Sequence, residues 1–182
     1  FDIAGLVGAR EEVGAVHLGY EVLGTDAELE ALAANCEYAL IAVGKIKSAD
    51  ARKRLAKRVL EFGFKLPTIV SPSARLSPHA TLGPGTIVMH RAVVNAGANV
   101  GVNCILNTGC LIEHDATLGD FVHLATGAIV NGNSAVGDCT FIGSGAVVRE
   151  GLVLGAGCLV GMGARVRRDL EAGARFTGSG GE

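Results

Sequence analysis

The sequence predicts a parallel β-solenoid of hexapeptide repeats, preceded by a small α/β domain. Every sixth residue from Val70 to Val166 is Leu, Ile or Val, 17 positions without an insertion. Gly follows the aliphatic residue every 18 residues, at positions 83, 101, 119, 137 and 155. A helix cannot keep a period of six on one face, and a single strand repeats every two residues. A prism of three short strands per 18-residue coil can, so we expect about five coils with the aliphatic residue pointing inward.

The residue two positions before each aliphatic one is mostly Ala, Ser, Thr or Cys. Three cysteines, Cys104, Cys110 and Cys158, occupy this position, which predicts that they pack in the interior. The five cysteines are odd in number and contain no CxxC pair. This pattern favours reduced thiols in a cytosolic protein over a disulfide framework.

Residues 1–65 follow a different pattern, in which short apolar runs alternate with amphipathic segments. Thr25 and Glu28 have capping-box spacing at the start of one such segment, and Gly63 closes the other. Strand, helix, strand and helix in this order predict a small parallel α/β domain. The expected strands are 2–7, 20–23 and 38–44, and the expected helices are 25–35 and 48–63.

Composition excludes several classes of partner. The formal net charge is −2 and the sequence pI is about 6.2, which argues against a nucleic acid or an anionic membrane as the main partner. There is no basic stripe, and only 4% of the residues are aromatic. No apolar run is long enough to span a bilayer and no secretory leader is present, so we expect a cytoplasmic protein.

The segment IEHDATLGDFVH, residues 112–123, gathers two histidines and two acids in a chain that is otherwise small and apolar. His114 comes two residues after the inward Ile112, so it should point outward near a corner of the prism. Its neighbours on adjacent coils, Ala96 and Gly132, are small. Asp115 can hold one imidazole nitrogen and strengthen the other as a base. This pattern favours a functional His114 over a merely solvated one.

The second histidine of the segment, His123, precedes the inward Leu124 and is expected at a different corner. Just past it, the column Thr126, Ser144 and Met162 offers an edge for a long, thin ligand. Since nine residues span half of an 18-residue coil, the two histidines of one chain should lie on different faces. Zinc needs about three convergent ligands, so no metal site is expected.

The sequence resembles the left-handed β-helix acyltransferases. More narrowly, NTGCLIEHDATLGDFVHLATGAIVNG (107–132) and LPTIVSPSARLSPHATLGPGT (66–86) resemble the sialic-acid O-acetyltransferase and nucleotide-sugar 4-amino N-acetyltransferase subfamily. The resemblance implies a left-handed helix and a homotrimer with acetyl-CoA between subunits. It also implies His114 as general base, supported by Asp115. The positions of His123, Ser144 and Met162 match residues that line the acetyl-CoA site.

The implied reaction is direct transfer of the acetyl group, without an acyl-enzyme on Cys110. Gly132, one coil from His114, is the candidate main-chain donor to the tetrahedral oxyanion. Family members open with a strand and a GGHG turn that do not precede Phe1, so the α/β domain is expected to be truncated. We expect an acceptor-binding domain at 1–65, an acetyltransferase domain at 66–170 and a C-terminal tail at 171–182.

The predicted function is acetyl-CoA-dependent N-acetylation of a nucleotide-linked amino sugar of the UDP-4-amino-4-deoxy type. O-acetylation of a sugar such as sialic acid would use the same base and co-substrate, and the sequence does not separate the two. A non-catalytic solenoid scaffold is the alternative from another class, although the presence of His114 beside Asp115 argues against it. A zinc-dependent hydratase of the solenoid type is a third alternative.

Overall fold

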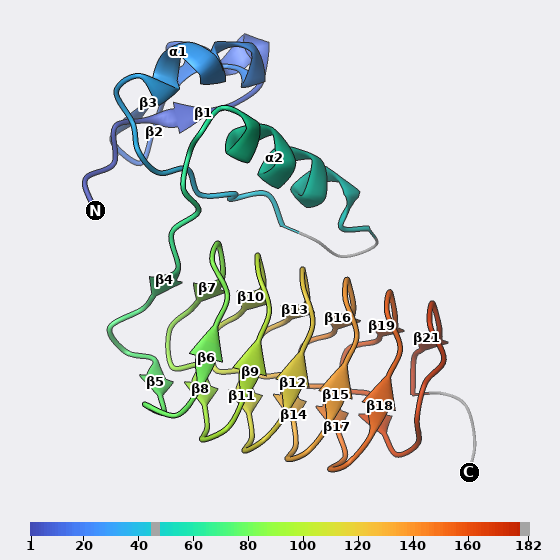
Figure 1. Cartoon of the computed structure of the whole chain (residues 1–182). Helices are drawn as coiled ribbons and strands as arrows, with labels where there is room; N and C mark the ends of the chain where they lie inside the picture. Colours follow the sequence, from blue (N-terminus) through green and yellow to red (C-terminus); the bar gives the residue numbers. More distant parts are fainter. Residues whose placement is uncertain (45–47, 179–182) are drawn as a thin grey trace.

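The structure, a computed structural model, describes residues 1–44 and 48–178. A small N-terminal part lies at one end of a long stack of short strands, and the last strand, β21 (Arg175–Phe176), lies at the opposite end (Figure 1). Residues 179–182, the end of the expected tail, lie outside the described residues.

The N-terminal part begins with a three-stranded sheet in the order β1-β3-β2. Strand β1 (Leu6–Val7) is parallel to β3 (Tyr20–Gly24), whereas β2 (Val16–His17) is antiparallel to it. The expected parallel arrangement therefore holds for one pair of strands only. Strand β1 covers the end of the run predicted at 2–7, and the short helix η1 (Arg10–Glu12) follows it.

The first predicted helix starts where the capping box indicates. The Thr25 side chain accepts a hydrogen bond from the Ala27 N–H, and Glu28 Oε2 accepts one from the Thr25 N–H at 2.7 Å. The helix that follows is short, a turn of 3₁₀ helix η2 (Asp26–Glu28) leading into α1 (Leu29–Ala33). It ends before residue 35, the boundary expected from the sequence.

The prediction of a strand at 38–44 is wrong. This segment is irregular apart from one bridge between Tyr38 and Lys65. The reason is Arg52 on helix α2 (Asp50–Glu61), because its guanidinium donates to the carbonyls of Ile41 and Val43 at 2.7 and 2.6 Å. These carbonyls therefore bond to a side chain instead of a neighbouring strand.

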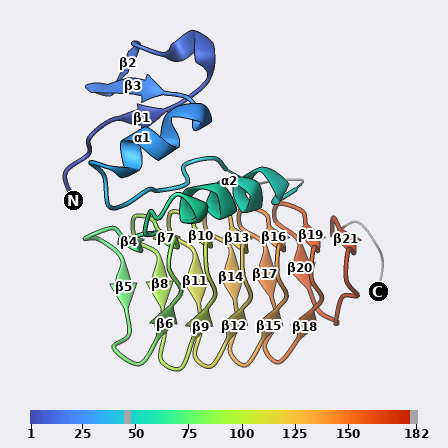
Figure 2. The ribbon, with the colours of Figure 1, turned by 45° about the horizontal axis from the view of Figure 1, so that its top comes forward.

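Arg52 also joins helix α2 to the solenoid, since it donates to the carbonyl of Asn103 at 3.2 Å. Its side chain is 2% exposed, and burial lowers the pKa of the guanidinium. Helix α2 lies along one edge of the solenoid, roughly parallel to its axis (Figure 2). The N-terminal part is thus fixed to the side of the strand stack.

From residue 69 the chain forms a solenoid of two-residue parallel strands, arranged in sheets of seven, six and five strands. Except in the last coil, each strand pairs with the strand 18 residues further on, for example Ile112 with Val130. This stack fits the left-handed β-helix expected from the sequence. The seven-stranded sheet contains β4 (Ile69–Val70), β7 (Ile87–Val88), β10 (Ile105–Leu106), β13 (His123–Leu124), β16 (Phe141–Ile142), β19 (Leu159–Val160) and β21 (Arg175–Phe176). The six-stranded sheet contains β5 (Arg75–Leu76), β8 (Val93–Val94), β11 (Leu111–Ile112), β14 (Ile129–Val130), β17 (Val147–Val148) and β20 (Arg165–Val166). The five-stranded sheet contains β6 (Thr81–Leu82), β9 (Asn99–Val100), β12 (Thr117–Leu118), β15 (Ala135–Val136) and β18 (Val153–Leu154).

The core consists of the aliphatic residues that the period of six selects. Ile112, Leu118 and Leu124, one from each sheet, are 0, 2 and 0% exposed. The small residues two positions earlier fill the space near the corners, and the three cysteines predicted to pack inside are buried with them. Burial raises the pKa of the Cys104 and Cys110 thiols to about 12.

The solenoid continues past the boundary expected at Leu170, to Phe176 in strand β21. Its last coil is two residues short, because Val160 pairs with Phe176, and 176 − 160 is 16. Leu154 likewise bridges to Leu170. A count in steps of six therefore stops at Val166, and it predicted about five coils. The sheets of seven, six and five strands make about six coils.

Candidate active site

His114 lies where the sequence predicts it, at the corner between β11 of the six-stranded sheet and β12 of the five-stranded sheet. The turn requires a left-handed residue next, and Asp115 fills that position with φ of 58°. Asp tolerates this conformation better than most residues. The backbone thereby holds the Asp115 carboxylate beside the imidazole, with His114 Nδ1 2.9 Å from Asp115 Oδ2.

This hydrogen bond determines which ring nitrogen is available for chemistry. An ionised carboxylate only accepts hydrogen bonds, so Nδ1–H of His114 is the donor and Nε2 carries the lone pair. The side chains of His114 and Asp115 are 59% and 60% exposed. Nε2 is therefore an accessible base whose tautomer is set by its neighbour.

Glycines on the adjacent coils make room for this pair. A Cβ atom at Gly132 would lie 2.8 Å from both Cε1 and Nε2 of His114. On the opposite side, a Cβ atom at Gly97 would overlap the Asp115 carboxylate. The space that the sequence predicts around His114 is thus occupied by the imidazole itself, which leans over Gly132.

The Gly132 N–H meets the requirement for a main-chain donor. Within residues 1–44 and 48–178 it donates no hydrogen bond. At two other corners the corresponding N–H groups are capped by side chains, that of Val102 by Asp120 and that of Asp120 by Asp138, at 2.9 and 2.8 Å. Gly132 N–H, beside the His114 ring, has no such cap.

His123 differs from the expectation of a corner position. It lies in strand β13, beside the inward Leu124, and pairs with Ile105 and Phe141 of the neighbouring strands. Its side chain is 9% exposed, and its ring meets that of Phe141 edge-on with centroids 5.1 Å apart. As the 18-residue period predicts, His123 and His114 of one chain are on different faces.

Ser144 and Met162 lie one above the other at the corner between the seven- and six-stranded sheets. The Gly163 N–H donates to the Ser144 carbonyl at 2.9 Å, and the Met162 side chain is 78% exposed. This corner is on the opposite edge of the six-stranded sheet from His114. One chain therefore brings together His114, Asp115 and Gly132, but not His123, Ser144 or Met162.

Other chemistry finds less support at this site. In the described part of the chain, no three His, Cys, Asp or Glu side chains converge as metal ligands. The Cys110 side chain is buried, and its raised thiol pKa disfavours the nucleophilic thiolate. None of the helices in residues 1–44 and 48–178 has both the length and the apolar character that a bilayer crossing requires.

Sequence reasoning missed a group of basic residues on the six-stranded sheet, Arg149, Arg165 and Arg167. They line a hollow together with Asn131, next to Gly132. Two of these arginines are 18 residues apart, so a search for charges repeating at the coil period finds them.

Comparison with solved structures identifies the family. A perosamine N-acetyltransferase variant from Caulobacter crescentus, in complex with CoA and GDP-perosamine, superposes with a TM-score of 0.88 and 33% identity, over 94% of this chain and 80% of that one. The acetyltransferase domain of PglB from Neisseria gonorrhoeae, in complex with acetyl coenzyme A, gives 0.86 and 32%, over 94% and 82%. WeeI from Acinetobacter baumannii gives 0.83 and 26%, over 92% and 79%. No family model matches the chain, and no curated protein matches it in sequence.

The fold and these relatives define a hexapeptide-repeat acyltransferase. The chain belongs, within that class, to the hexapeptide-repeat sugar N-acetyltransferases. The predictions of this family and of an acetyltransferase are thus confirmed, and the scaffold alternative is wrong. The perosamine N-acetyltransferase structure holds CoA and the PglB domain holds acetyl-CoA, which is the expected co-substrate.

Proposed function

We propose that this protein transfers an acetyl group from acetyl-CoA to the amino group of a nucleotide-linked amino sugar. The observation that carries the proposal is the His114–Asp115 pair, 2.9 Å apart, with Nε2 accessible beside Gly132. Relatives that bind GDP-perosamine support a nucleotide-linked amino sugar as the acceptor. The nucleotide is UDP, as in the UDP-4-amino-4-deoxy sugars, or GDP.

In the proposed mechanism, the amine nitrogen of the sugar attacks the thioester carbonyl carbon and a C–N bond forms. His114 Nε2 accepts the proton that the amine loses, and Asp115 stabilises the resulting imidazolium through Nδ1–H. The tetrahedral intermediate then collapses and the C–S bond breaks, and the His114 imidazolium gives its proton to the departing sulfur, so that CoA leaves as the thiol. General-base help of this kind is typically worth about 10²–10⁴-fold in rate.

Gly132 has a second role in this mechanism, because its N–H is the donor to the oxyanion. It is one coil from His114, and within the described residues it has no other acceptor. A donor that is already oriented and uncommitted stabilises developing negative charge without reorganisation. The same glycine thus makes space for the base and supplies the oxyanion donor.

A complete acetyl-CoA site requires two chains in this proposal. His123, Ser144 and Met162 contact the co-substrate but lie on other faces than His114 of the same chain. Two outer faces carry half-buried apolar columns, whereas the five-stranded sheet carries polar residues such as Thr117. Packing one apolar face on the other closes a homotrimer with sites between subunits. The columns are Val93, Leu111, Ile129 and Val147 on the six-stranded sheet, and Ile87, Ile105, Phe141 and Leu159 on the seven-stranded sheet.

The N-terminal part, residues 1–65, holds the acceptor in this proposal. Arg52 fixes helix α2 to the solenoid, so the acceptor domain has a defined position relative to the coils. Such fixed positioning brings the amine and the thioester together with the geometry that direct transfer needs.

The test is thiol release from acetyl-CoA with a panel of UDP- and GDP-linked amino sugars, for the native protein and for His114→Ala. We expect release that requires an amino sugar and falls about 10²-fold or more in the variant. His79→Ala is the control, since His79 is an exposed histidine of the solenoid, two coils away from the His114–Asp115 pair. Equal activity of native protein and His114→Ala would refute the base assignment.

A further inference from the structure

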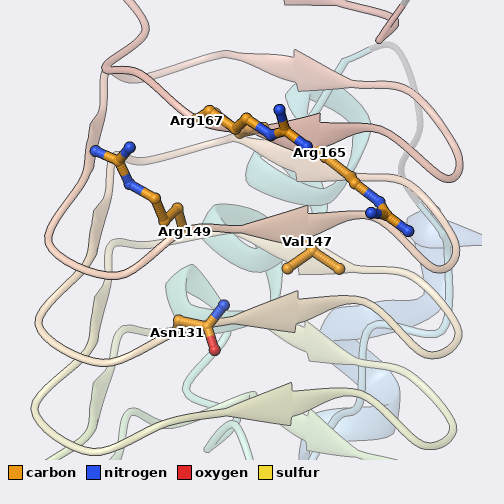
Figure 3. A pocket seen from close by; sticks show the side chains of 6 residues that line it. Asn131, Val147, Arg149, Arg165 and Arg167 are labelled. Atoms are coloured by element: carbon orange, nitrogen blue, oxygen red, sulfur yellow. The ribbon is translucent and has the colours of Figure 1, made fainter.

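The edge of the six-stranded sheet beside the His114 corner carries a column of polar residues. One position after each inward aliphatic residue of this sheet stand Ser77, Asn95, Glu113, Asn131, Arg149 and Arg167. The equivalent positions of the five-stranded sheet, 83, 101, 119, 137 and 155, are all glycine. The C-terminal half of the column is basic, since Arg149 and Arg167 follow Asn131 (Figure 3). The three residues of the N-terminal half carry no positive charge.

Glu113, the residue directly before His114, has unused hydrogen-bonding capacity. The Asn95 side chain donates from Nδ2 to Glu113 Oε2 at 2.8 Å, and both residues are half-buried. Within residues 1–44 and 48–178, Glu113 Oε1 accepts no hydrogen bond and the carboxylate forms no ion pair. An ionised carboxylate can accept about four hydrogen bonds. Glu113 is therefore fixed through one oxygen and open to a ligand through the other.

The carboxylate and the base point to opposite sides of their coil. Glu113 bonds to Asn95 on the coil before, whereas the His114 imidazole lies over Gly132 on the coil after. At a strand spacing of about 4.8 Å, the carboxylate and Nε2 are roughly 5–10 Å apart. The nitrogen and oxygen of a vicinal amino alcohol are about 3 Å apart, so with a hydrogen bond of about 2.9 Å at each end it reaches over roughly 9 Å. An amine at Nε2 and a hydroxyl group at Glu113 thus fit one sugar ring.

The chemistry of this half of the column suits an uncharged, hydroxyl-bearing ligand. A hydroxyl group that donates to a carboxylate forms a strong, charge-assisted hydrogen bond. A phosphate group is repelled by the same carboxylate. This half also lies toward the end of the solenoid where the N-terminal part sits (Figure 1). The sugar ring of the acceptor, rather than its diphosphate, is the part that fits beside Glu113.

We propose that Glu113, held in place by Asn95, binds the hydroxyl group next to the amine of the acceptor sugar. The enzyme thereby selects amino sugars that have a hydroxyl group on the neighbouring carbon. The proposal rests on the proposed function, since it assumes that the amine reacts at His114 Nε2. Glu113 is a binding residue for the acceptor, Asn95 is a positioning residue, and neither takes part in proton transfer.

The test compares each amino sugar with an analogue that lacks the neighbouring hydroxyl group. The probes are GDP-perosamine and UDP-4-amino-4-deoxyglucose, each beside its 3-deoxy analogue. For native protein we expect kcat/KM to be roughly 10–100-fold lower for the analogue, the range for a lost hydrogen bond to a charged group. Glu113→Ala should reduce this difference to about threefold or less, with KM for acetyl-CoA unchanged.

Three further variants sharpen the result. Glu150→Ala is the matched control, because Glu150 is an exposed acid on the same corner as His114, two coils further on, and it should discriminate as native protein does. Glu113→Gln keeps an acceptor for Asn95 and should give an intermediate difference. Asn95→Ala should weaken the discrimination in the native background and have no such effect in Glu113→Ala. The proposal is overturned if native protein uses both sugars equally well, or if Glu113→Ala still discriminates as native protein does.

Binding to His114→Ala separates this proposal from the proposed function. Calorimetry with the four probes should show tighter binding of the two sugars that have the hydroxyl group, and this advantage should disappear in His114→Ala/Glu113→Ala. If it does so while native protein releases no thiol with either sugar, the proposed function alone fails. Thiol release that shows no dependence on Glu113 overturns this proposal alone, and the absence of both binding and release overturns both.

Discussion

The imidazole of His114 lies against Gly132 on the next coil, so close that a Cβ atom there would be 2.8 Å from Nε2. The φ angle of Gly132 is not in the left-handed region, so its backbone accepts any L-residue. The need for glycine at this position is therefore steric. It comes from the orientation that Asp115 gives the ring through Nδ1.

Gly132→Ala should reduce activity without unfolding the protein. The added methyl group overlaps Cε1 and Nε2 of His114 and displaces the base, and a misplacement of about 1 Å is enough to cost roughly 10²-fold in rate. Steady-state thiol release and thermal unfolding, measured together, test this expectation. Gly44→Ala is the control, since no atom of the described residues lies within 4 Å of a Cβ atom placed at Gly44.

A double variant distinguishes displacement of the base from other damage. In a His114→Ala background, Gly132→Ala should cause little further loss of activity, because the ring that the methyl group displaces is already gone. Fully additive losses would show that the added methyl group does not act through the His114 ring.

Asp115→Asn should lower kcat by roughly 10–10²-fold while leaving KM for acetyl-CoA nearly unchanged. The amide can present either a donor or an acceptor to Nδ1, so it no longer enforces the tautomer with a free Nε2. Asn tolerates the left-handed conformation that residue 115 adopts, with φ of 58°, so the turn should persist. A kcat equal to that of the native protein would argue against the supporting role of Asp115.

The solenoid was predictable because its register is local. An aliphatic residue every six positions and glycine every 18 determine which side chains point inward, and Ile112, Leu118 and Leu124 are buried as this register requires. The last coil escaped the count because it has 16 residues, so that Phe176 rather than residue 178 pairs with Val160. A shortened coil breaks the period without breaking the stack.

The site was predictable in part for the same reason. The 18-residue period brings Gly132 next to His114, whatever the details of packing. The burial of His123 between Ile105 and Phe141 depends on a strand pairing that the corner assignment missed. The irregular segment 38–44 depends on Arg52, whose contacts with Ile41 and Val43 are tertiary and leave no local pattern.

Leu118→Asp should prevent folding of the solenoid. Leu118 is 2% exposed inside the stack, and an unpaired carboxylate there costs several kcal/mol. Thr117→Asp, at the neighbouring outward and exposed position, is the matched control and should fold normally. Far-UV circular dichroism and thermal unfolding of both variants report the difference. A stable, soluble Leu118→Asp protein would refute the inward register.

The buried thiols should make the free energy of unfolding fall as the pH rises above about 9. Burial raises the pKa of Cys104 and Cys110 from 9.0 to about 12, whereas in the unfolded chain both ionise near the ordinary value. Between these values the unfolded state has released protons that the folded state retains, so alkaline pH favours unfolding. Each thiol contributes a slope of about 1.4 kcal/mol per pH unit at most.

Cys104→Ala/Cys110→Ala should fold, because alanine fills the same position in other coils, as at Ala116 and Ala128. Urea unfolding between pH 8.5 and 10.5 should show the free energy of unfolding falling more steeply with pH for the native protein than for the double variant. An equal fall in both proteins would mean that the thiols ionise without unfolding.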